Sequence, residues 1–296
     1  MRKKIFEIIV IGTSLLLAGC GSRGEVKRDA SGKQVLSGYI TLSGAFALYP
    51  LAIQWADEFH RLHPDVDIDI SAGGAGKGIT DVLADQVDIA MVSRELKPQE
   101  KEKGALAYAV AKDAVVATIN ANNPAYRYLL KTGLSQKQAT AIWEGKTKLN
   151  VYTRSDACGA AETWAAFLGK KQEDLKGTGV FGDPGVAETL QKDVNGIGFN
   201  NIGYAYNDKT HKPTKGIAIV PIDVNGNGKL DAEEKFYDTL DDLMDAIAKG
   251  KYPAPPARNL YLVTAGKPKN PVVVEFLKYV RTKGQRLNAP AGFVHI

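Results

Sequence analysis

From about residue 36 onward, the sequence alternates short β-branched runs with amphipathic helical patterns. The strand-like runs are 38–42, 66–70, 87–92, 113–120, 149–153 and 259–263. The helical patterns are 50–62, 79–83, 135–144, 160–168, 238–248 and 272–280. In the first of these helices Leu51, Trp55, Phe59 and Leu62 recur four, four and three residues apart, which places them on one face. This alternation predicts an α/β fold with a mostly parallel sheet covered by helices.

Length and two breaks in the pattern predict more than one lobe. The chain has 296 residues, which is enough for two domains or lobes with a sizeable core. A clear break falls at Asn122-Asn123-Pro124, and the proline-rich stretch 253–256 indicates a linker. The length therefore predicts two domains or lobes, and these two segments interrupt the α/β pattern.

The composition excludes several classes of protein. Hydrophobic residues make up 44% of the chain and charged residues 24%, which is too apolar for a disordered protein. The net charge of +5 is spread along the sequence, and beyond the first four residues no basic cluster is interleaved with aromatics, so we expect no nucleic-acid partner. Two cysteines are too few for a disulfide scaffold or a cysteine-based zinc site.

The first twenty residues have the pattern of an export signal. A basic end at 2–4 precedes an apolar run over 8–17, whose helix would reach only about 15 Å, half the hydrocarbon core of a bilayer. The following Leu17-Ala18-Gly19-Cys20 resembles the lipobox of bacterial lipoproteins, which a buried N-terminal helix would not explain. We therefore expect a lipid anchor at Cys20. The expected boundaries are a signal peptide over 1–20 and a flexible tether over 21–35.

Three turns rich in small residues each follow a predicted strand and precede a predicted helix. They are Ser43–Ala47, Gly73–Gly78 and Arg154–Ala160. Parallel α/β sheets bind ligands at such turns, beyond the carboxyl ends of the strands. A helix start presents unpaired amide groups and a partial positive charge, and small residues let an anion approach them. One such turn would be ordinary loop glycine, but three of them, one carrying Arg154, predict an anion site.

Two nucleotide-binding motifs do not fit these turns. The glycines of 73–78 lack the GxGxxG spacing of dinucleotide-binding proteins. They also lack the GxxxxGK[ST] pattern of a P-loop. We therefore expect no organic cofactor.

The stretches SGAFALYPLAIQWADEF (43–59) and YTRSDACGAAETWAAFLG (152–169), with 65–79, 87–98 and 195–206, carry a resemblance to a known family. They resemble the phosphate-binding proteins of the bacterial high-affinity phosphate ABC importer, in a lipoprotein form. The resemblance implies a two-lobed fold of the periplasmic-binding-protein type II kind, each lobe a mixed, mostly parallel sheet flanked by helices. The implied lobes are 36–119 with 251–296, and 120–250, hinging closed over phosphate.

The resemblance also implies which residues contact phosphate. By position they are Ala45, Phe46, Ala47, Ala75, Ser93, Arg94, Arg154, Cys158, Gly159 and Ala160. The family usually has Ser or Thr hydroxyls at the positions of Ala45, Phe46, Ala75, Cys158 and Ala160. Here backbone amides and Arg154 would supply the donors instead. Where some members carry a carboxylate acceptor this chain has Ser93-Arg94, which leaves Asp156 or Glu95 as conjectural substitutes.

Several of these residues also have a plainer interpretation. For Arg154 it is a surface salt bridge, the usual fate of an arginine in a loop. For Cys158 we favour a small buried residue over a nucleophile, because no histidine lies near it in sequence. His60 and His63 have a helical spacing, but Pro64 ends that helix at once, so we expect no metal site there.

A separate twelve-residue segment, 223–234, matches the calcium-binding loop of EF-hand proteins. The expected oxygen ligands are Asp223, Asn225, Asn227, Lys229, Asp231 and Glu234. Gly228 allows the sharp turn, and Leu230 is expected to face the core. The alternative is a polar hairpin turn rich in Asn-Gly. The pattern predicts a structural calcium ion near the hinge or at a lobe edge.

Together these observations predict a binding protein and not an enzyme. We expect a monomeric lipoprotein of the cell envelope, facing the periplasm or the outside, that captures inorganic phosphate and delivers it to a membrane ABC permease. A binding protein for another oxyanion, or a phosphate sensor, is an alternative. An extracellular phosphoester hydrolase using Cys158 or a metal is less favoured, because the thiol lacks a paired base in the sequence.

Overall fold

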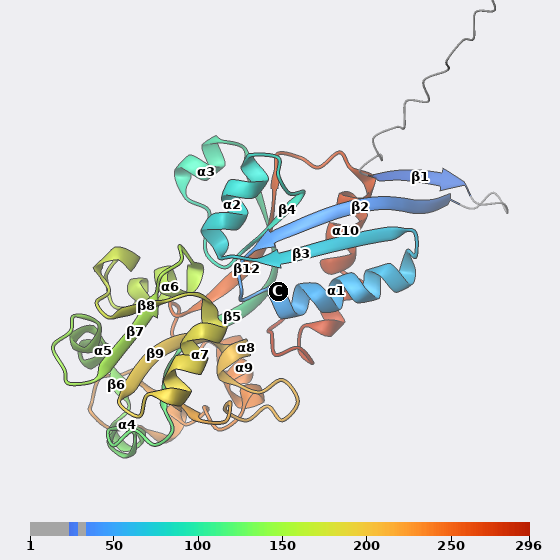
Figure 1. Cartoon of the computed structure of the whole chain (residues 1–296). Helices are drawn as coiled ribbons and strands as arrows, with labels where there is room; N and C mark the ends of the chain where they lie inside the picture. The colour runs from blue at the N-terminus through green and yellow to red at the C-terminus, as the bar shows by residue number, and fades with distance from the viewer. Residues whose placement is uncertain (1–23, 29–33) are drawn as a thin grey trace, which may run out of the picture.

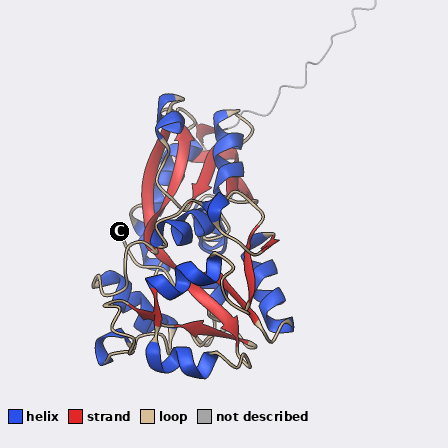
Figure 2. Cartoon of the chain, turned by 90° about the vertical axis from the view of Figure 1, so that its left-hand side faces the viewer, coloured by secondary structure: helices blue, strands red, loops and turns tan. Residues whose placement is uncertain are grey.

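The structure is a computed structural model that describes residues 24–28 and 34–296. Figure 1 shows two lobes joined by long strands. In the side view of Figure 2, helices flank the strands in both the upper and the lower part of the molecule. The predicted signal peptide and Cys20 lie outside the described residues.

The first lobe contains the N-terminal strands and returns for the last long strand and helix. Its strands are β1 (Gly24–Arg28), β2 (Gln34–Gly44), β3 (Val66–Ala72), β4 (Ile89–Val92) and β12 (Ala257–Ala265). Its helices are α1 (Tyr49–Leu62), α2 (Ala75–Leu83), α3 (Pro98–Glu102) and α10 (Pro271–Val280). β2 pairs in parallel with β3 and β4, whereas β12 runs antiparallel to β4.

Helix α1 shows how the sequence pattern becomes packing. Pro50 fits its first turn because an amide there has no helical partner to lose. Leu51, Trp55 and Phe59 are fully buried, as predicted, but Leu62 at the end of the helix is 49% exposed. The predicted face is therefore confirmed for its first three residues and wrong for the fourth. Phe59 packs edge-on against Phe276 of α10, with ring centres 5.2 Å apart. The helix therefore covers one side of the first lobe's sheet and presents its N-terminus to the other lobe.

The second lobe is a smaller set of strands wrapped by helices. Its strands are β6 (Leu134–Ser135), β7 (Asn150–Arg154), β8 (Thr178–Val180), β9 (Gly196–Asn201), β10 (Ile217–Val220) and β11 (Ile222–Asp223). Its helices are α4 (Tyr126–Thr132), α5 (Gln136–Trp143), α6 (Gly159–Phe167), α7 (Gly182–Lys192), α8 (Ile202–Ala205) and α9 (Leu240–Ala248). Trp143 and Trp164 meet edge-on at 5.0 Å, and Trp164 stacks on Phe199 at 5.9 Å. These rings fix α5 and α6 against β9.

Strand β5 (Ala105–Asn120) belongs to both lobes. Its first part pairs with β12, and its last residues pair with β9 and β10. The core of the first lobe includes Ala111, and that of the second begins at Ala114. The chain thus changes lobe inside a continuous strand, earlier than the predicted boundary at 119/120.

Two sequence expectations need correction. Gly24–Arg28, inside the predicted tether 21–35, pair antiparallel with β2 as strand β1. Four of its five side chains are exposed, so backbone pairing holds it without an apolar pattern to reveal it. The sheets are mixed, as predicted, but the described strands form as many antiparallel as parallel ladders. The strands that run between the lobes account for much of this difference.

Within 24–28 and 34–296, the structure has no helix with the length and hydropathy needed to cross a bilayer.

Candidate anion site between the lobes

The three small-residue turns meet where the lobes face each other. The first precedes α1, and the second is the start of α2; both belong to the first lobe. The third joins β7 to α6 in the second lobe. The Gly76 amide donates to the Ala157 carbonyl across the gap at 3.1 Å. The guanidinium carbon of Arg154 lies 5.5 Å from the centre of the Phe46 ring.

Five amide groups around this point have no acceptor in the described part of the chain. They belong to Phe46, Ala47, Ala75, Gly159 and Ala160. Each precedes or begins a helix, where the first amides have no partner within the helix. All five are positions that the sequence predicted for anion contact. The structure therefore gathers backbone donors from three helix starts at one place.

Two other predicted positions use their amides elsewhere. The Ala45 amide donates to the Met91 carbonyl at 2.8 Å. The Cys158 amide donates weakly to Gln172 Oε1 at 3.4 Å. These residues shape the turns but leave fewer amides for a ligand than the sequence predicted.

Glycine is required where the lobes approach most closely. A Cβ at Gly159 would stand 2.3 Å from the Ser93 carbonyl oxygen. Gly74 has a φ of +93°, which a residue with a side chain rarely adopts, and a Cβ there would also lie 2.9 Å from the Ala157 carbonyl oxygen. The excess of glycine in the second turn thus has a steric cause.

Arg154 is the one guanidinium among these helix starts, and it is already bound by two carboxylates. Its side chain is 1% exposed. Nε and Nη2 donate to Asp156 Oδ1 and Oδ2 at 2.8 and 2.7 Å, and Nη1 donates to Asp183 Oδ2 at 2.6 Å. Burial alone would lower the pKa of Arg154, but the charges of Asp183 and Asp156 outweigh it and raise that pKa above its ordinary value. Arg154 is therefore salt-bridged, as the alternative interpretation held, but inside the protein and not on its surface.

These contacts leave Arg154 with a limited capacity. A guanidinium has five N–H donors, and three of them are used by Asp156 and Asp183. With both carboxylates ionised, the three side chains carry a net charge of −1. An anion at this site must therefore be held mainly by backbone amides, with at most two further bonds from Arg154.

Phe46 closes over the guanidinium from the opposite lobe. Its ring meets Phe181 edge-on, with centres 5.7 Å apart. Its carbonyl accepts a hydrogen bond from the Tyr204 hydroxyl at 3.1 Å. Since Phe181 and Tyr204 belong to the second lobe, the structure is the closed arrangement of the lobes.

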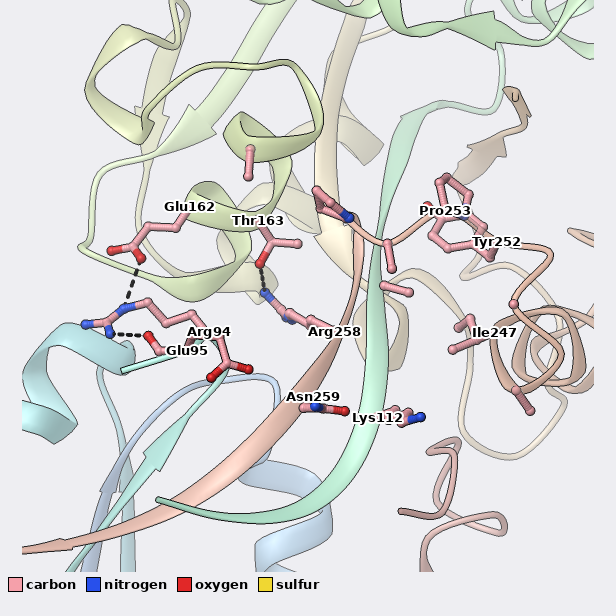
Figure 3. A pocket seen from close by; sticks show the side chains of 16 residues that line it. Arg94, Glu95, Lys112, Glu162, Thr163, Ile247, Tyr252, Pro253, Arg258 and Asn259 are labelled. Atoms are coloured by element: carbon pink, nitrogen blue, oxygen red, sulfur yellow. Dashed lines mark hydrogen bonds and ion pairs between the residues drawn. The ribbon is translucent and has the colours of Figure 1, made fainter. Parts of the chain in front are cut away.

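Ser93 and Arg94 have different positions at the site. Ser93 is buried against Gly159. The Arg94 guanidinium contacts Glu100 at 2.7 and 2.8 Å. It also contacts Glu162 at 3.0 Å, as Figure 3 shows. Glu162 lies on α6 and also pairs with Lys97 at 2.9 Å. Arg94 thus bridges the lobes, whereas the sequence suggested a direct ligand contact.

A cavity of about 710 Å³ opens beside Arg154. Lys97, Lys170 and Lys171 line it. Glu162 and Glu173 line it as well, and Lys97 and Lys170 are paired with Glu162 and Glu144. The cavity lining therefore carries charges of both signs.

Cys158 has the position of a structural residue. Its Sγ accepts the Ala161 amide at 3.4 Å and so caps α6. Burial raises the pKa of the thiol to about 12, which disfavours the thiolate that a nucleophile needs. No group of three or more His, Cys, Asp or Glu side chains is gathered for a metal ion anywhere in the described ranges.

Sequence reasoning missed Asp183, which completes the shell around Arg154. Asp183 lies in the first turn of α7, right after β8. The local sequence Phe181-Gly182-Asp183-Pro184-Gly185 is a fourth strand-to-helix turn with the same small-residue composition. Gly182 has a φ of +72° and packs against Phe46. The small residues of this turn could have indicated from the sequence that Asp183 belongs to the same site.

The segment 223–234 folds into a compact loop next to the hinge linker. Asp223 accepts the amides of Gly226 and Gly228 at 2.8 and 2.9 Å, and Glu234 accepts that of Val224 at 2.8 Å. The two carboxylates are 2% and 5% exposed, and in the described structure neither contacts a cationic side chain. Asp223 also lines a cavity of about 260 Å³ with prolines of the linker 253–256.

Leu230 is buried, as predicted, whereas the calcium ion itself stays a prediction. Buried carboxylates without a counter-charge are costly unless a cation compensates them. Carboxylate, amide and carbonyl oxygens are the donors that calcium prefers. The donors are therefore of the right chemical kind for the predicted ion, but the described structure does not gather the carboxylates of Asp223, Asp231 and Glu234 into one metal-binding group.

Comparisons with known proteins agree with this architecture. A family model described as a PBP superfamily domain matches residues 29–283. The phosphate-binding protein PstS of Bacillus subtilis is 25% identical over 227 residues, covering 70% of this chain and 73% of its own. PstS of Staphylococcus epidermidis (strain ATCC 12228) is 24% identical over 300 residues, covering 96% and 86%.

Solved structures with the same fold include two transport proteins. A putative phosphate ABC transporter substrate-binding protein with bound phosphate from Clostridium perfringens has a TM-score of 0.71 and 21% identity, covering 88% of this chain and all of its own. An ABC-type phosphate transport receptor from Vibrio cholerae has a TM-score of 0.63 and 20% identity, covering 87% of this chain and all of its own. At these identities the likeness concerns the fold.

The burial of Cys158 predicts an inert thiol. In a Cys20→Ser variant, where Cys158 is the only cysteine, the folded protein should not react with a disulfide reagent at about pH 8, because only about 10⁻⁴ of the thiol is ionised four units below its pKa. Absorbance of the released thiol measures this, with the protein unfolded in guanidinium as the positive control. Labelling of the folded protein as fast as the unfolded chain would restore the nucleophile interpretation.

Proposed function

We propose that this chain, which belongs to the PBP superfamily, is an extracytoplasmic solute-binding protein that captures inorganic phosphate between its lobes and delivers it to a membrane ABC transporter. The relatives named above are phosphate-binding proteins by name, and one of the similar structures holds phosphate. Binding is reversible and involves no covalent step. The chain is proposed to act as a monomer.

One observation carries this proposal: five unpartnered amides and a buried guanidinium lie at turns that contact one another between the lobes. A hydrogen bond to a charged group contributes about 1.5–3 kcal/mol. Micromolar affinity requires about 8 kcal/mol. Four or five such bonds reach that value, so the site binds an oxyanion without the hydroxyl donors that Ala75 and Ala160 lack.

The proposed cell location rests on the sequence alone. Residues 1–20 have the export pattern and Cys20 the lipobox, and both lie outside the described residues. A lipid at Cys20 would tether the protein to a membrane. Delivery of phosphate to a membrane transporter is consistent with such a tether.

We also propose a structural calcium ion in the loop 223–234. The ligands would be Asp223, Asn225, Asn227, Lys229, Asp231 and Glu234, the lysine through its carbonyl oxygen. The ion would compensate the buried charges of Asp223 and Glu234. The hinge linker 253–256 lies beside this loop, so the ion would stiffen the point where the chain leaves the second lobe.

Replacement of the guanidinium should weaken phosphate binding. An Arg154→Lys variant keeps the charge against Asp156 and Asp183 but loses the fork, and we expect its phosphate affinity to fall by roughly tenfold or more, the equivalent of one charge-assisted bond. Titration calorimetry with phosphate, sulfate and arsenate measures this. Arg286→Lys, an exposed arginine paired with Glu58, is the matched control and should bind as the native protein does.

Two outcomes would contradict the proposed function. Native protein that releases heat with sulfate but not with phosphate is a binding protein for another oxyanion. Unchanged phosphate affinity in Arg154→Lys would place the site elsewhere.

Calcium should stabilise the folded protein. With weak extracellular-type affinity, about 10 mM calcium adds about 1.4–2.7 kcal/mol, which raises the melting temperature by several degrees relative to chelator. Glu234→Gln should abolish this shift because it removes the buried bidentate carboxylate. Glu233→Gln, at the exposed neighbouring position, should keep it. A melting temperature that does not respond to calcium would leave the loop as a polar turn.

A further inference from the structure

A buried ion pair links strands β5 and β12 where they pass between the lobes. Arg258 of β12 and Asp113 of β5 are direct partners in the strand ladder. Arg258 Nε and Nη2 donate to Asp113 Oδ1 and Oδ2 at 2.8 and 3.2 Å. The Arg258 side chain is 7% exposed, so this is a desolvated and fixed pair.

Arg258 also reaches the second lobe in two directions. Nη1 donates to the Thr163 hydroxyl on α6 at 3.1 Å, as Figure 3 shows. Nη2 donates to Asn201 Oδ1 at the end of β9. Helix α6 is the helix whose first residues, Gly159 and Ala160, present free amides at the site. The Arg258 guanidinium therefore contacts both α6, which presents those amides, and Asn201.

Asn201 connects the strand pair to the anion site. Its Nδ2 donates to Asp183 Oδ2 at 2.7 Å, and its backbone amide donates to Asp183 Oδ1 at 2.8 Å. The neighbours of the Asn201 side chain determine which of its two ends is the oxygen. A flipped amide would place its NH₂ group against the Arg258 donors and its oxygen against the Asp183 carboxylate, and neither pair can form a hydrogen bond. Asp183 Oδ2 in turn accepts Nη1 of Arg154.

We propose that Asn201 is a positioning residue for phosphate binding: it fixes Asp183, which orients Arg154, and it ties that guanidinium to the strands between the lobes through Arg258. This inference rests on the proposed function and deepens it. Asn201 and Asp183 do not touch the ligand. They set which guanidinium donors of Arg154 remain free and where these donors point.

The charges around Asn201 alternate. Arg258 of β12 faces its oxygen, and Asp183 of α7 faces its nitrogen. Behind them lie Asp113 of β5 and Arg154 of β7. A neutral residue with a donor on one side and an acceptor on the other is the one that joins these two ion pairs without repulsion.

The decisive variant is Asn201→Asp. It keeps the shape and the acceptor for Arg258 but places a second carboxyl group against Asp183, and the negative charge beside it raises the pKa of the introduced carboxyl. Protonated, the new carboxyl donates to Asp183 as the amide did; ionised, it repels Asp183. We expect the ratio of variant to native phosphate Kd to be roughly tenfold at about pH 8 and to fall toward one at about pH 5. Taking the ratio cancels the titration of phosphate itself.

A matched control separates positioning from stability. Asn288 is a fully buried asparagine in the first lobe, where its Nδ2 donates to the Val110 carbonyl at 3.0 Å. Asn288→Asp should also lower the melting temperature, but its phosphate Kd ratio should stay near one at every pH. A flat ratio near one for Asn201→Asp, like that of the control, would overturn the inference.

A second readout does not need phosphate. In ¹⁵N spectra the Arg154 Nε–H, identified by its loss in Arg154→Lys, should exchange slowly with water in the native protein because it is buried on Asp156. Asn201→Asp should speed this exchange by roughly tenfold at about pH 8 and not at about pH 5. If native protein binds no phosphate, the proposed function fails, and the exchange rate still decides the role of Asn201.

A variant that does not fold also leaves the inference testable. Asn201→Ser removes both side-chain bonds without adding a charge. It should weaken phosphate binding and speed Arg154 exchange to the same degree at every pH. Native-like affinity and exchange in Asn201→Ser would show that Asp183 and Arg154 hold their places without Asn201.

Discussion

The burial of Arg154 between Asp156 and Asp183 is the interaction on which the rest of the site depends. A lone guanidinium in this position would pay a desolvation penalty of several kcal/mol, and the two carboxylates offset it. The same carboxylates occupy three of its five donors and make the cluster negative overall. Arg154 therefore marks and orients the site, while most of the attraction for an anion must come from elsewhere.

In the binding mode we propose, that attraction comes from backbone amides, which accounts for the small residues at these turns. Amides at Phe46, Ala75 and Gly159 are free because each lies just before or at a helix start, and the three helices begin close to one another. Such closeness tolerates no side chain at Gly159, which abuts Ser93 of the other lobe. Backbone amides fix the position of an oxyanion through geometry alone. The choice among phosphate, arsenate and sulfate therefore depends on the nearby carboxylates, which repel the charge of each anion and can accept a proton from those that carry one.

The features that sequence could predict are local ones. The apolar spacing of α1 predicted the burial of Leu51, Trp55 and Phe59, although it also predicted that of Leu62, which is exposed. The spacing within 223–234 likewise predicted the burial of Leu230. The lobe boundary within β5 was missed because a strand that continues through it shows no break. Asp183 was missed because its partner Arg154 is 29 positions away, and only the fold brings them together. β1 was missed because backbone pairing leaves no side-chain pattern.

Closure and binding depend on the same contacts. The site lies between two sets of links across the lobes: Phe46 with Phe181 on one side and Glu162 with Arg94 on the other. In the binding mode we propose, the contacts between the lobes and the bonds to phosphate favour the same arrangement of the lobes. A site poor in side-chain donors can then still bind tightly, provided that its lobes close as they do here.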